Sequence, residues 1–234
     1  SLSLARSCPI ALAPAMNVHM WTNAATQRYV SQLKKDGVLF FGPDSGEQAC
    51  GDIGLGRMTD AEELFKSIQN HLTPKILNNK KLLITSGGTI EMIDDVRGIT
   101  NLSSGNMGFA IANTAASMGA SVTLITSTHQ NFSENIKVIH TSDAHSMHQA
   151  VLEHINNQDV FISVAAVSDY KPKEKFKGKL KKSDSDMTLQ LTPTIDILKE
   201  IGLSKNKIFK VGFAAENENL IENAQKKLKA KNLD

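Results

Sequence analysis

A carboxylate follows an apolar segment in the second half of the chain. Residues 160–164 are apolar except for Ser163, small residues come next, and Asp169 lies just beyond them. A carboxylate at the end of a buried strand can hold Mg²⁺, which neutralises the charge of a bound triphosphate. The alternative is that Asp169 only caps a turn, which is a common use of Asp in loops.

A lysine-rich stretch comes directly after Asp169. Residues 171–182 are dense in lysine and include one glutamate, one proline and one glycine. Charge runs usually form a solvated face, but this one has no helical apolar stripe and adjoins the predicted ligand edge. We therefore interpret residues 171–182 as a mobile basic loop suited to a polyphosphate.

Two turns of small residues could bring backbone N–H groups to the same ligand. Gly87 and Gly88 follow the apolar segment 82–85, and residues 101–108 open a predicted helix. Backbone N–H groups at a helix start favour a phosphate or a carboxylate. Neither turn matches the dinucleotide fingerprint G-x-G-x-x-G or the Walker pattern. A tight strand-to-helix turn with a Ser cap therefore remains the alternative.

The first part of the chain carries different reactive groups. Asn17 lies just beyond a predicted strand, and Cys50 lies in a glycine-rich loop. A Cys in such a loop can be exposed and can act as an acid or a nucleophile. Cys8, within the predicted strand, is expected to be inert packing. The histidines lack Cys or carboxylate companions at ligand spacing, so the sequence carries no zinc signature.

Composition excludes several classes of protein. The chain has 234 residues, 41% of them hydrophobic and 21% charged, which is an ordinary globular mixture. The net charge of +2 is too small to indicate nucleic-acid binding through bulk charge. No apolar run approaches the roughly 20 residues of a membrane span. Two cysteines build no disulfide framework, so we expect a cytoplasmic location. Both ends look cut, which indicates a fragment of a longer protein.

Strand and helix patterns alternate from Leu82 onward. The predicted strands are apolar throughout, which indicates a parallel sheet covered on both faces. We expect an α/β fold with a doubly wound sheet that binds ligands at the carboxyl ends of its strands. Strands are predicted over 82–85, 122–126, 137–140, 160–164 and 208–213, and helices over 106–118, 143–157, 194–201 and 217–230.

The residues before this sheet form a second α/β piece. Apolar spacing predicts a helix from Trp21 to Leu33, and Thr59 to Glu62 has the capping-box pattern that opens a helix. A short strand at 38–41 and a glycine-rich loop at 42–58 lie between these helices. We therefore divide the chain into a first domain of residues 1–73, a linker of residues 74–81 and a second domain of residues 82–234.

Several motifs together resemble a known family. Residues 14–21 and 49–58 resemble phosphopantothenoylcysteine decarboxylase. A second set of motifs resembles phosphopantothenate–cysteine ligase. It comprises residues 86–91, 95–97, 101–108, 165–170, 179–182 and 212–216. In this order the motifs are similar to the bifunctional proteins of coenzyme A biosynthesis. The resemblance implies a mainly parallel, Rossmann-like ligase domain preceded by part of a flavodoxin-like flavoprotein domain. It also implies that the start of the decarboxylase and the end of the ligase are missing.

The resemblance implies a ligase that uses CTP. In such a ligase a carboxylate attacks the α-phosphorus of CTP, and cysteine then converts the acyl-cytidylate into an amide. Asn101 and Lys179 match the catalytic positions, Asp169 matches a Mg²⁺ or CTP contact, and Arg97, Ala166 and Asn101 match contacts to phosphopantothenate. The nucleotide-binding positions match Ser163, Val164, Ala165, Asp169, Lys179, Asp196, Ile197, Phe213, Lys227 and Lys231.

One ligase motif departs from the family pattern. The family usually has N-P-D-I at the helix start after the basic loop, whereas this chain has Thr194-Ile-Asp-Ile197. The proline is absent, so the nucleotide contacts of Asp196 and Ile197 are carried over weakly.

The resemblance also implies roles in the decarboxylase part. Asn17 would bind the substrate carboxylate, and Cys50 would protonate the intermediate after FMN-assisted oxidation and loss of CO₂. The catalytic His of that family and most of its FMN-binding residues would lie upstream of Ser1. We therefore expect decarboxylation in the full-length protein and not in this chain alone.

The expected partners are small molecules and copies of the same chain. The substrates would be 4′-phosphopantothenate, L-cysteine and CTP, and the resemblance implies a ligase dimer; no nucleic acid or membrane is expected. A first alternative is a nucleotide- or FMN-binding oligomerisation module without activity. A second is a nicotinamide oxidoreductase, which the missing G-x-G-x-x-G motif disfavours.

Overall fold

The computed structural model describes residues 3–130, 132–133, 135–181, 186–205, 207–214 and 219–234. The chain divides into two compact units, Ser1–Thr73 (unit 1) and Pro74–Asp234 (unit 2), and each is described by itself. Among the described residues, no helix is both long enough and apolar enough to cross a membrane.

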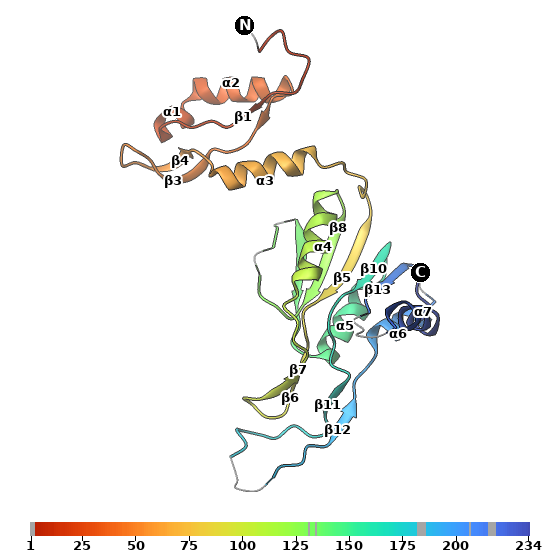
Figure 1. Ribbon diagram of the computed structural model, residues 1–234. Helices are drawn as coiled ribbons and strands as arrows, with labels where there is room; N and C mark the ends of the chain where they lie inside the picture. Colours follow the sequence, from red (N-terminus) through yellow and green to blue (C-terminus); the bar gives the residue numbers. More distant parts are fainter. Residues whose placement is uncertain (1–2, 131, 134, 182–185, 206, 215–218) are drawn as a thin grey trace. The chain divides into compact units, whose positions relative to one another are not determined.

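A five-stranded parallel sheet forms the centre of unit 2 (Figure 1). Its strands run in the spatial order β13-β10-β5-β8-β9, and all four neighbouring pairs are parallel. This arrangement confirms the predicted doubly wound fold. The strand bounds are β5 Lys81–Ser86, β8 Ser121–Thr126, β9 Ile136–His140, β10 Val160–Ser163 and β13 Phe209–Gly212.

Alternate residues of these strands supply two separate cores, because successive side chains of a strand point to opposite faces. Leu83 and Phe161 pack on one face with residues of α5 (Ala144–His154) and α6 (Ile197–Leu203). Ile84 packs on the other face with residues of α4 (Asn106–Ser117). Helices therefore cover both faces. The last helix, α7 (Leu220–Ala230), follows β13.

The strand order reverses direction at a switch point between β5 and β10. From β5 the chain proceeds to β8 on one side, whereas β10 lies on the other side of β5. Ligands of open α/β sheets bind beyond the carboxyl ends of the strands, near such a switch point. A bridge between Gly88 and Ala166 joins the two loops beyond the strand ends.

Two short antiparallel pairs were not predicted from the sequence. One joins β6 (Ile90–Met92) to β7 (Gly98–Thr100), and the other joins β11 (Tyr170–Pro172) to β12 (Leu191–Pro193). Each strand has three residues, which is too short to produce a detectable alternation of apolar and polar residues. The predicted basic loop therefore begins within a strand and continues between β11 and β12.

Unit 1 is built from smaller elements. Its parallel pair has two residues in each strand, and the predicted glycine-rich loop contains an antiparallel hairpin, β3 with β4. The predicted helix from Trp21 is interrupted at Asn23, which ends α1 and caps α2. The bounds are β1 Ala11–Leu12, α1 Val18–Thr22, α2 Ala24–Lys35, β2 Leu39–Phe40, β3 Asp44–Glu47, β4 Ile53–Arg57 and α3 Ala61–Leu72.

Two local predictions for unit 1 were wrong. Cys8 is exposed and precedes β1, so it is not packed within a strand. The predicted capping box at Thr59 does not form, because Asp60 is the N-cap of α3 and makes no side-chain cap hydrogen bond. The Thr59 hydroxyl is instead buried and has no hydrogen-bond partner among the described residues. A sequence pattern cannot tell which of two adjacent polar residues takes the cap.

Candidate functional site

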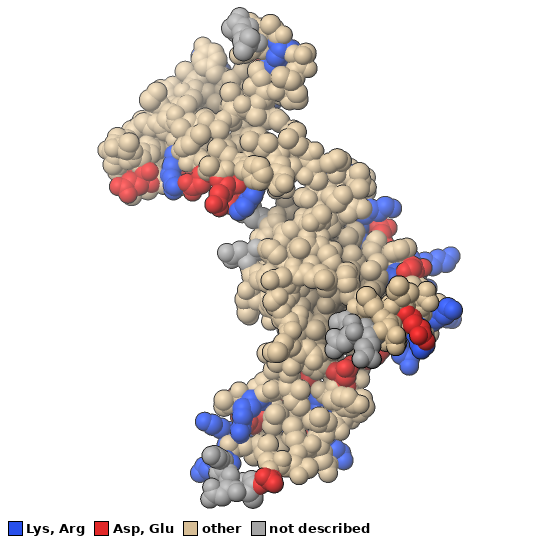
Figure 2. Space-filling view, in the orientation of Figure 1, with Lys and Arg blue, Asp and Glu red and all other residues tan. Residues whose placement is uncertain are grey.

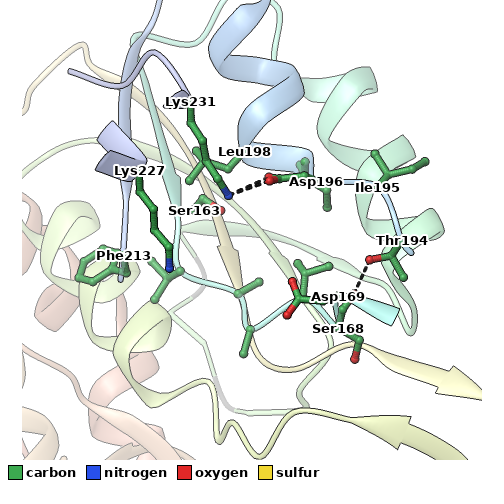
Figure 3. Close-up of a pocket in the computed structure, with 15 residues that line it drawn as sticks. Ser163, Ser168, Asp169, Thr194, Ile195, Asp196, Leu198, Phe213, Lys227 and Lys231 are labelled. Carbon is green, nitrogen blue, oxygen red and sulfur yellow. Dashed lines mark hydrogen bonds and ion pairs between the residues drawn. The ribbon is translucent and has the colours of Figure 1, made fainter. Parts of the chain in front are cut away.

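A cavity of about 300 Å³ lies beyond the carboxyl ends of β10 and β13 (Figure 3). The β10 strand and its following loop form one wall, the start of α6 forms another, and α7 contributes two lysines. The lining residues are Ser163, Val164, Ala165, Ala166, Val167, Ser168, Asp169, Thr194, Ile195, Asp196, Ile197, Leu198, Phe213, Lys227 and Lys231.

Backbone hydrogen bonds hold the loop after β10 in place. Val164 N donates to the Thr85 carbonyl at 3.2 Å, and Ala166 N donates to the Gly87 carbonyl at 2.8 Å. The neighbouring Gly88 must be a glycine, because a Cβ there would lie 2.5 Å from the Asn101 carbonyl oxygen. The wall of the cavity is thus fixed by the main chain of the sheet.

Two cations reach the cavity from the end of α7. Figure 3 shows the side chains of Lys227 and Lys231 extending towards it. The Lys231 Nζ atom lies 2.8 Å from Asp196 Oδ2, and Asp196 also caps α6 by accepting a hydrogen bond from Lys199 N at 3.0 Å. Partial burial alone would raise the pKa of Asp196, but the contacts from Lys231 and Lys199 outweigh it and lower the pKa.

Asp169 stands at the rim of the cavity. Its carbonyl accepts a hydrogen bond from Thr194 N at 2.9 Å, and the Thr194 hydroxyl donates to the Ser168 carbonyl. The Asp169 side chain is exposed and forms no ion pair with any described residue. Among the described residues, no three His, Cys, Asp or Glu side chains gather as a metal site. Asp169 therefore fits Mg²⁺ only as one ligand among phosphate oxygens and water.

The structure brings most of the predicted nucleotide-binding residues together. All of them except Lys179 line this one cavity, and so does Ala166. Lys179 is exposed in the loop after β11. The last lysine of its K-x-K-K motif, Lys182, lies outside the described residues. Sequence reasoning missed Thr194 and Leu198, although Thr194 stands in the motif that departs from the family pattern.

Asn101 reaches the loop that forms the cavity wall. Its Nδ2 atom donates to the Val167 carbonyl at 3.1 Å and to the Ala166 carbonyl at 3.4 Å. Arg97 does not line the cavity. Its guanidinium is held by Asp94, with Nη2 2.6 Å from Asp94 Oδ2. The two residues expected to contact phosphopantothenate from this hairpin thus both bind other parts of the chain.

A second cluster lies in unit 1. Asn17 Nδ2 donates to Asp52 Oδ2 at 2.7 Å and to Cys50 Sγ at 3.1 Å, and Cys50 Sγ lies 3.5 Å from Asp52 Oδ2. The hydrogen bond from Asn17 lowers the pKa of Asp52. Asp52 was missed from the sequence, although it stands two residues after Cys50 in the same glycine-rich segment. The cluster combines a thiol, a carboxylate and an amide.

This cluster does not by itself fit FMN. Asn17, Gln48, Cys50 and Asp52 include no cation for the flavin phosphate, and the Asp52 carboxylate would repel that phosphate. The groups that would hold the flavin phosphate are therefore expected outside these four residues.

The sequence matches two protein families. Residues 77–234 match the family described as "DNA/pantothenate metabolism flavoprotein C-terminal domain", which covers more than half of the chain. The chain belongs to the DNA/pantothenate metabolism flavoprotein family. Residues 2–73 match the family described as "Flavoprotein". The resemblance noted from the motifs is thereby confirmed.

Curated relatives of the family span both units. The "Coenzyme A biosynthesis bifunctional protein CoaBC" of Vibrio cholerae is 44% identical over 238 residues, which are 100% of this chain and 60% of that protein. The protein of the same name from Bacillus subtilis is 43% identical over 99% of this chain and 58% of its own length. The chain thus spans about 60% of the length of these relatives.

A solved structure has the same fold. The C-terminal domain of a CoaBC protein matches with a TM-score of 0.60 and 42% identity, over 67% of this chain and 75% of that one.

A further relative, 42% identical over 99% of this chain and 67% of its own length, is named "Cysteine/Cysteine sulfinic acid decarboxylase", from an unknown prokaryotic organism. Membership of the family therefore does not determine the reaction of this chain.

Proposed function

We propose that unit 2 ligates 4′-phosphopantothenate and L-cysteine at the expense of CTP. The observation that supports this most is the single cavity that nine of the ten predicted nucleotide-binding residues line. The cavity combines strand-end backbone, the apolar surface of Phe213, the two lysines of α7 and the carboxylate of Asp169. These groups suit the base, the phosphates and the metal of a nucleoside triphosphate.

The first half-reaction forms an acyl-cytidylate. A carboxylate oxygen of phosphopantothenate attacks the α-phosphorus, the bond to the bridging oxygen breaks, and pyrophosphate leaves with its electron pair. Negative charge builds on the phosphoryl oxygens and on the leaving group. Lys227 and Lys231 lie where they can bind phosphate, and Lys179 would stabilise the charge from the basic loop. Mg²⁺, bound in part by Asp169, would supply further charge neutralisation.

The second half-reaction forms the amide. The amine of cysteine attacks the acyl carbon, CMP leaves, and the nitrogen loses a proton. We propose that Asn101 donates a hydrogen bond to the acyl oxygen in this step. Its amide nitrogen contacts the Ala166 carbonyl at 3.4 Å and the Val167 carbonyl at 3.1 Å. The acyl oxygen would replace the longer of these two contacts.

For the longer protein we propose a second activity, an FMN-dependent decarboxylation of the ligation product to 4′-phosphopantetheine. Within unit 1, Asn17 would bind the substrate carboxylate and Cys50 would donate a proton. Asn17 already donates to the Asp52 carboxylate at 2.7 Å. The substrate carboxylate would therefore compete with Asp52 for the same amide group.

The ligation is tested by omitting each substrate in turn. CTP, Mg²⁺, 4′-phosphopantothenate and L-cysteine are supplied, and the release of pyrophosphate and of CMP is measured. We expect pyrophosphate release to need phosphopantothenate, and CMP release to need cysteine as well. The assay is run on this chain and on a chain extended to the length of the relatives. If neither chain releases pyrophosphate or CMP, the proposal is contradicted.

Two variants separate the half-reactions. Lys179→Gln should abolish pyrophosphate release, since it removes charge stabilisation at the phosphoryl group. Asn101→Asp should retain the first half-reaction better than the second. Near-normal pyrophosphate release by Lys179→Gln, or equal loss of both steps in Asn101→Asp, would refute these roles. Thermal stabilisation by NADPH and not by CTP with Mg²⁺ would favour an oxidoreductase instead.

A further inference from the structure

The turn between β6 and β7 contains a fully buried carboxylate with many donors around it. Asp94 has no exposed side-chain surface. It accepts hydrogen bonds from Val96 N at 2.8 Å, from Arg97 N at 2.7 Å and from the Arg97 side chain at 2.6 and 3.0 Å. The fifth donor comes from a distant segment: Leu180 N lies 3.1 Å from Asp94 Oδ2. Asp94 thereby joins the turn to the basic loop.

Arg97 binds the other backbone polar group of Leu180, its carbonyl. Arg97 Nη2 donates to the Leu180 carbonyl at 2.7 Å. One ion pair thus holds both the N–H and the C=O of Leu180, the residue next to Lys179. Two further hydrogen bonds extend the docking: Phe176 N donates to the Ile93 carbonyl at 2.9 Å, and Gly178 N donates to Asp95 Oδ2 at 2.8 Å.

The hairpin that receives the loop is itself anchored at both ends. The buried Glu91 accepts a hydrogen bond from Ala144 N, at the start of α5, at 2.8 Å. The strand β7 leads directly to Asn101, whose amide contacts the cavity wall. The β6–β7 hairpin therefore connects to both Lys179 and Asn101. The Asp94–Arg97 ion pair links it to Lys179, and Asn101 directly follows β7. Figure 2 shows Lys and Arg side chains gathered over the end of unit 2 that β11 and β12 form in Figure 1.

We propose that Asp94 and Arg97 are positioning residues that hold Lys179 in place for attack at the α-phosphorus. Arg97 then acts on the reaction through Lys179. This inference rests on the proposed role of Lys179 in ligation. The expected contact of Arg97 with phosphopantothenate stays a prediction, and the guanidinium also binds a buried carboxylate and the carbonyl next to that lysine.

Two physical features make the ion pair suited to this role. The hydrogen bond from Arg97 lowers the pKa of Asp94 well below its ordinary value, so the carboxylate stays charged at any pH where the enzyme would work. The guanidinium offers several donors in a rigid plane, and here it spans a carboxylate and a carbonyl at once. A lysine at the same position would keep the charge but could not span both acceptors in this geometry.

The first test measures the docking of the loop without using activity. Asp94→Asn and the milder Arg97→Lys are treated with trypsin under native conditions, and cleavage after Lys179 and Lys181 is followed by mass spectrometry. We expect cleavage there to be at least about tenfold faster, because local opening limits proteolysis of a docked loop. Cleavage after Lys34 in unit 1 should stay unchanged. Unaltered cleavage after Lys179 in both variants would overturn the proposal.

The second test uses pyrophosphate release and a double variant. Asp94→Asn and Arg97→Lys should each lower kcat by at least about tenfold and change the KM for CTP by less than about threefold. In a Lys179→Gln background, Asp94→Asn should cause no further loss, since both changes remove the same interaction. A raised KM for phosphopantothenate without faster cleavage would show that Arg97 binds substrate directly, and additive losses would also contradict the proposal.

A matched control separates docking at Leu180 from the charge of the loop. Lys175→Met removes the 3.5 Å ion pair of Lys175 with Asp95, both of which are exposed, and leaves the contacts of Leu180 intact. This variant should leave the rate of cleavage after Lys179 unchanged. Should ligation be absent from the unaltered protein, the cleavage experiment would still decide whether Asp94 and Arg97 dock the loop.

Discussion

The two candidate sites differ in what holds their residues in place. The cavity of unit 2 lies at the ends of strands whose residues Leu83, Ile84 and Phe161 are completely buried. The cluster of unit 1 lies on an exposed hairpin, and Val38 is the one buried apolar residue among those described in this unit. The cavity is therefore positioned by the backbone of a packed sheet, whereas the cluster is positioned by side-chain hydrogen bonds.

This difference determines how each site can fail. In unit 2, a change far from the cavity can disturb it through the strands, because tightly packed interiors transmit strain. In unit 1, the contacts among Asn17, Cys50 and Asp52 can be lost one at a time with little effect on folding. Stability and site geometry should thus be coupled in unit 2 and separable in unit 1.

Removing a core side chain of unit 2 should have the largest effect. Phe161→Ala should lower the free energy of unfolding by about 3–5 kcal/mol, because a fully buried aromatic side chain is replaced by a cavity. Tyr29→Ala in unit 1, where the side chain is 63% exposed, should change it by no more than about 0.5 kcal/mol. Denaturation is followed by circular dichroism and by the fluorescence of Trp21, the single tryptophan, in unit 1.

The fluorescence signal decides whether the comparison holds. We expect Phe161→Ala to shift the circular dichroism transition and to leave the Trp21 transition in place. An equal shift of both transitions would mean that the units unfold together. The proposed difference in how the two sites are held would then be wrong.

Breaking the ion pair at the cavity should have the next largest effect. Lys231→Met removes a cation that we propose binds phosphate, and it leaves the Asp196 carboxylate without its ion-pair partner at 2.8 Å. We expect the KM for CTP to rise about 10- to 100-fold, since a charged contact is replaced by an unpaired negative charge. Lys229→Met, an exposed lysine of α7 outside the cavity, is the matched control. Equal effects of both variants would indicate general attraction and no specific contact.

Acid should separate the two sites by a smaller margin. The folded-state pKa of Asp196 lies below its ordinary value of 3.8, so its ionised form stabilises the fold above that pH. This stabilisation is lost as the pH falls through the folded-state value. The denaturation midpoint of unit 2 is measured from pH 6 to 3. In Asp196→Asn it should fall less on acidification than in the unaltered protein, because this carboxylate no longer titrates.

The matched change in unit 1 is Asp52→Asn. The pKa of Asp52 is lowered too, chiefly by the hydrogen bond from Asn17, so the sign of the effect is the same. We expect a smaller change in acid dependence, because Asp52 is bound by a neutral amide and a thiol, whereas Asp196 pairs with the cationic Lys231. A larger effect for Asp52→Asn than for Asp196→Asn would contradict the idea that side-chain contacts in unit 1 contribute little to folding.

The smallest effect is expected where unit 1 buries a polar group without a partner. Thr59→Val replaces the buried hydroxyl, which forms no hydrogen bond with any residue that the structure describes. The substitution should be neutral or should stabilise the protein by up to about 1 kcal/mol, because no hydrogen bond is lost and a desolvated polar atom is removed. The denaturation midpoint read from Trp21 fluorescence measures it. A clear loss of stability would reveal a partner for this hydroxyl.

Much of the fold of unit 2 could be predicted from the sequence. The five apolar segments became the five strands of the sheet, because buried parallel strands need apolar residues on both faces. The short strands β6, β7, β11 and β12 could not be predicted, since their pairing is set by partners distant in the chain. In unit 1 the helix cap at Asp60 was missed for a related reason: adjacent polar residues compete for one position.

The sequence by itself determined the class of sheet, the strand ends that carry Asp169 and Ser163, and the motifs that identify the family. Only the tertiary structure decided that α7 brings Lys227 and Lys231 to the cavity formed by β10, and that Asp94 and Arg97 bind the loop of Lys179. Local patterns report which backbone a segment prefers. Ion pairs and cavity walls depend on the register and packing of segments far apart in the chain, and no local pattern encodes these distances.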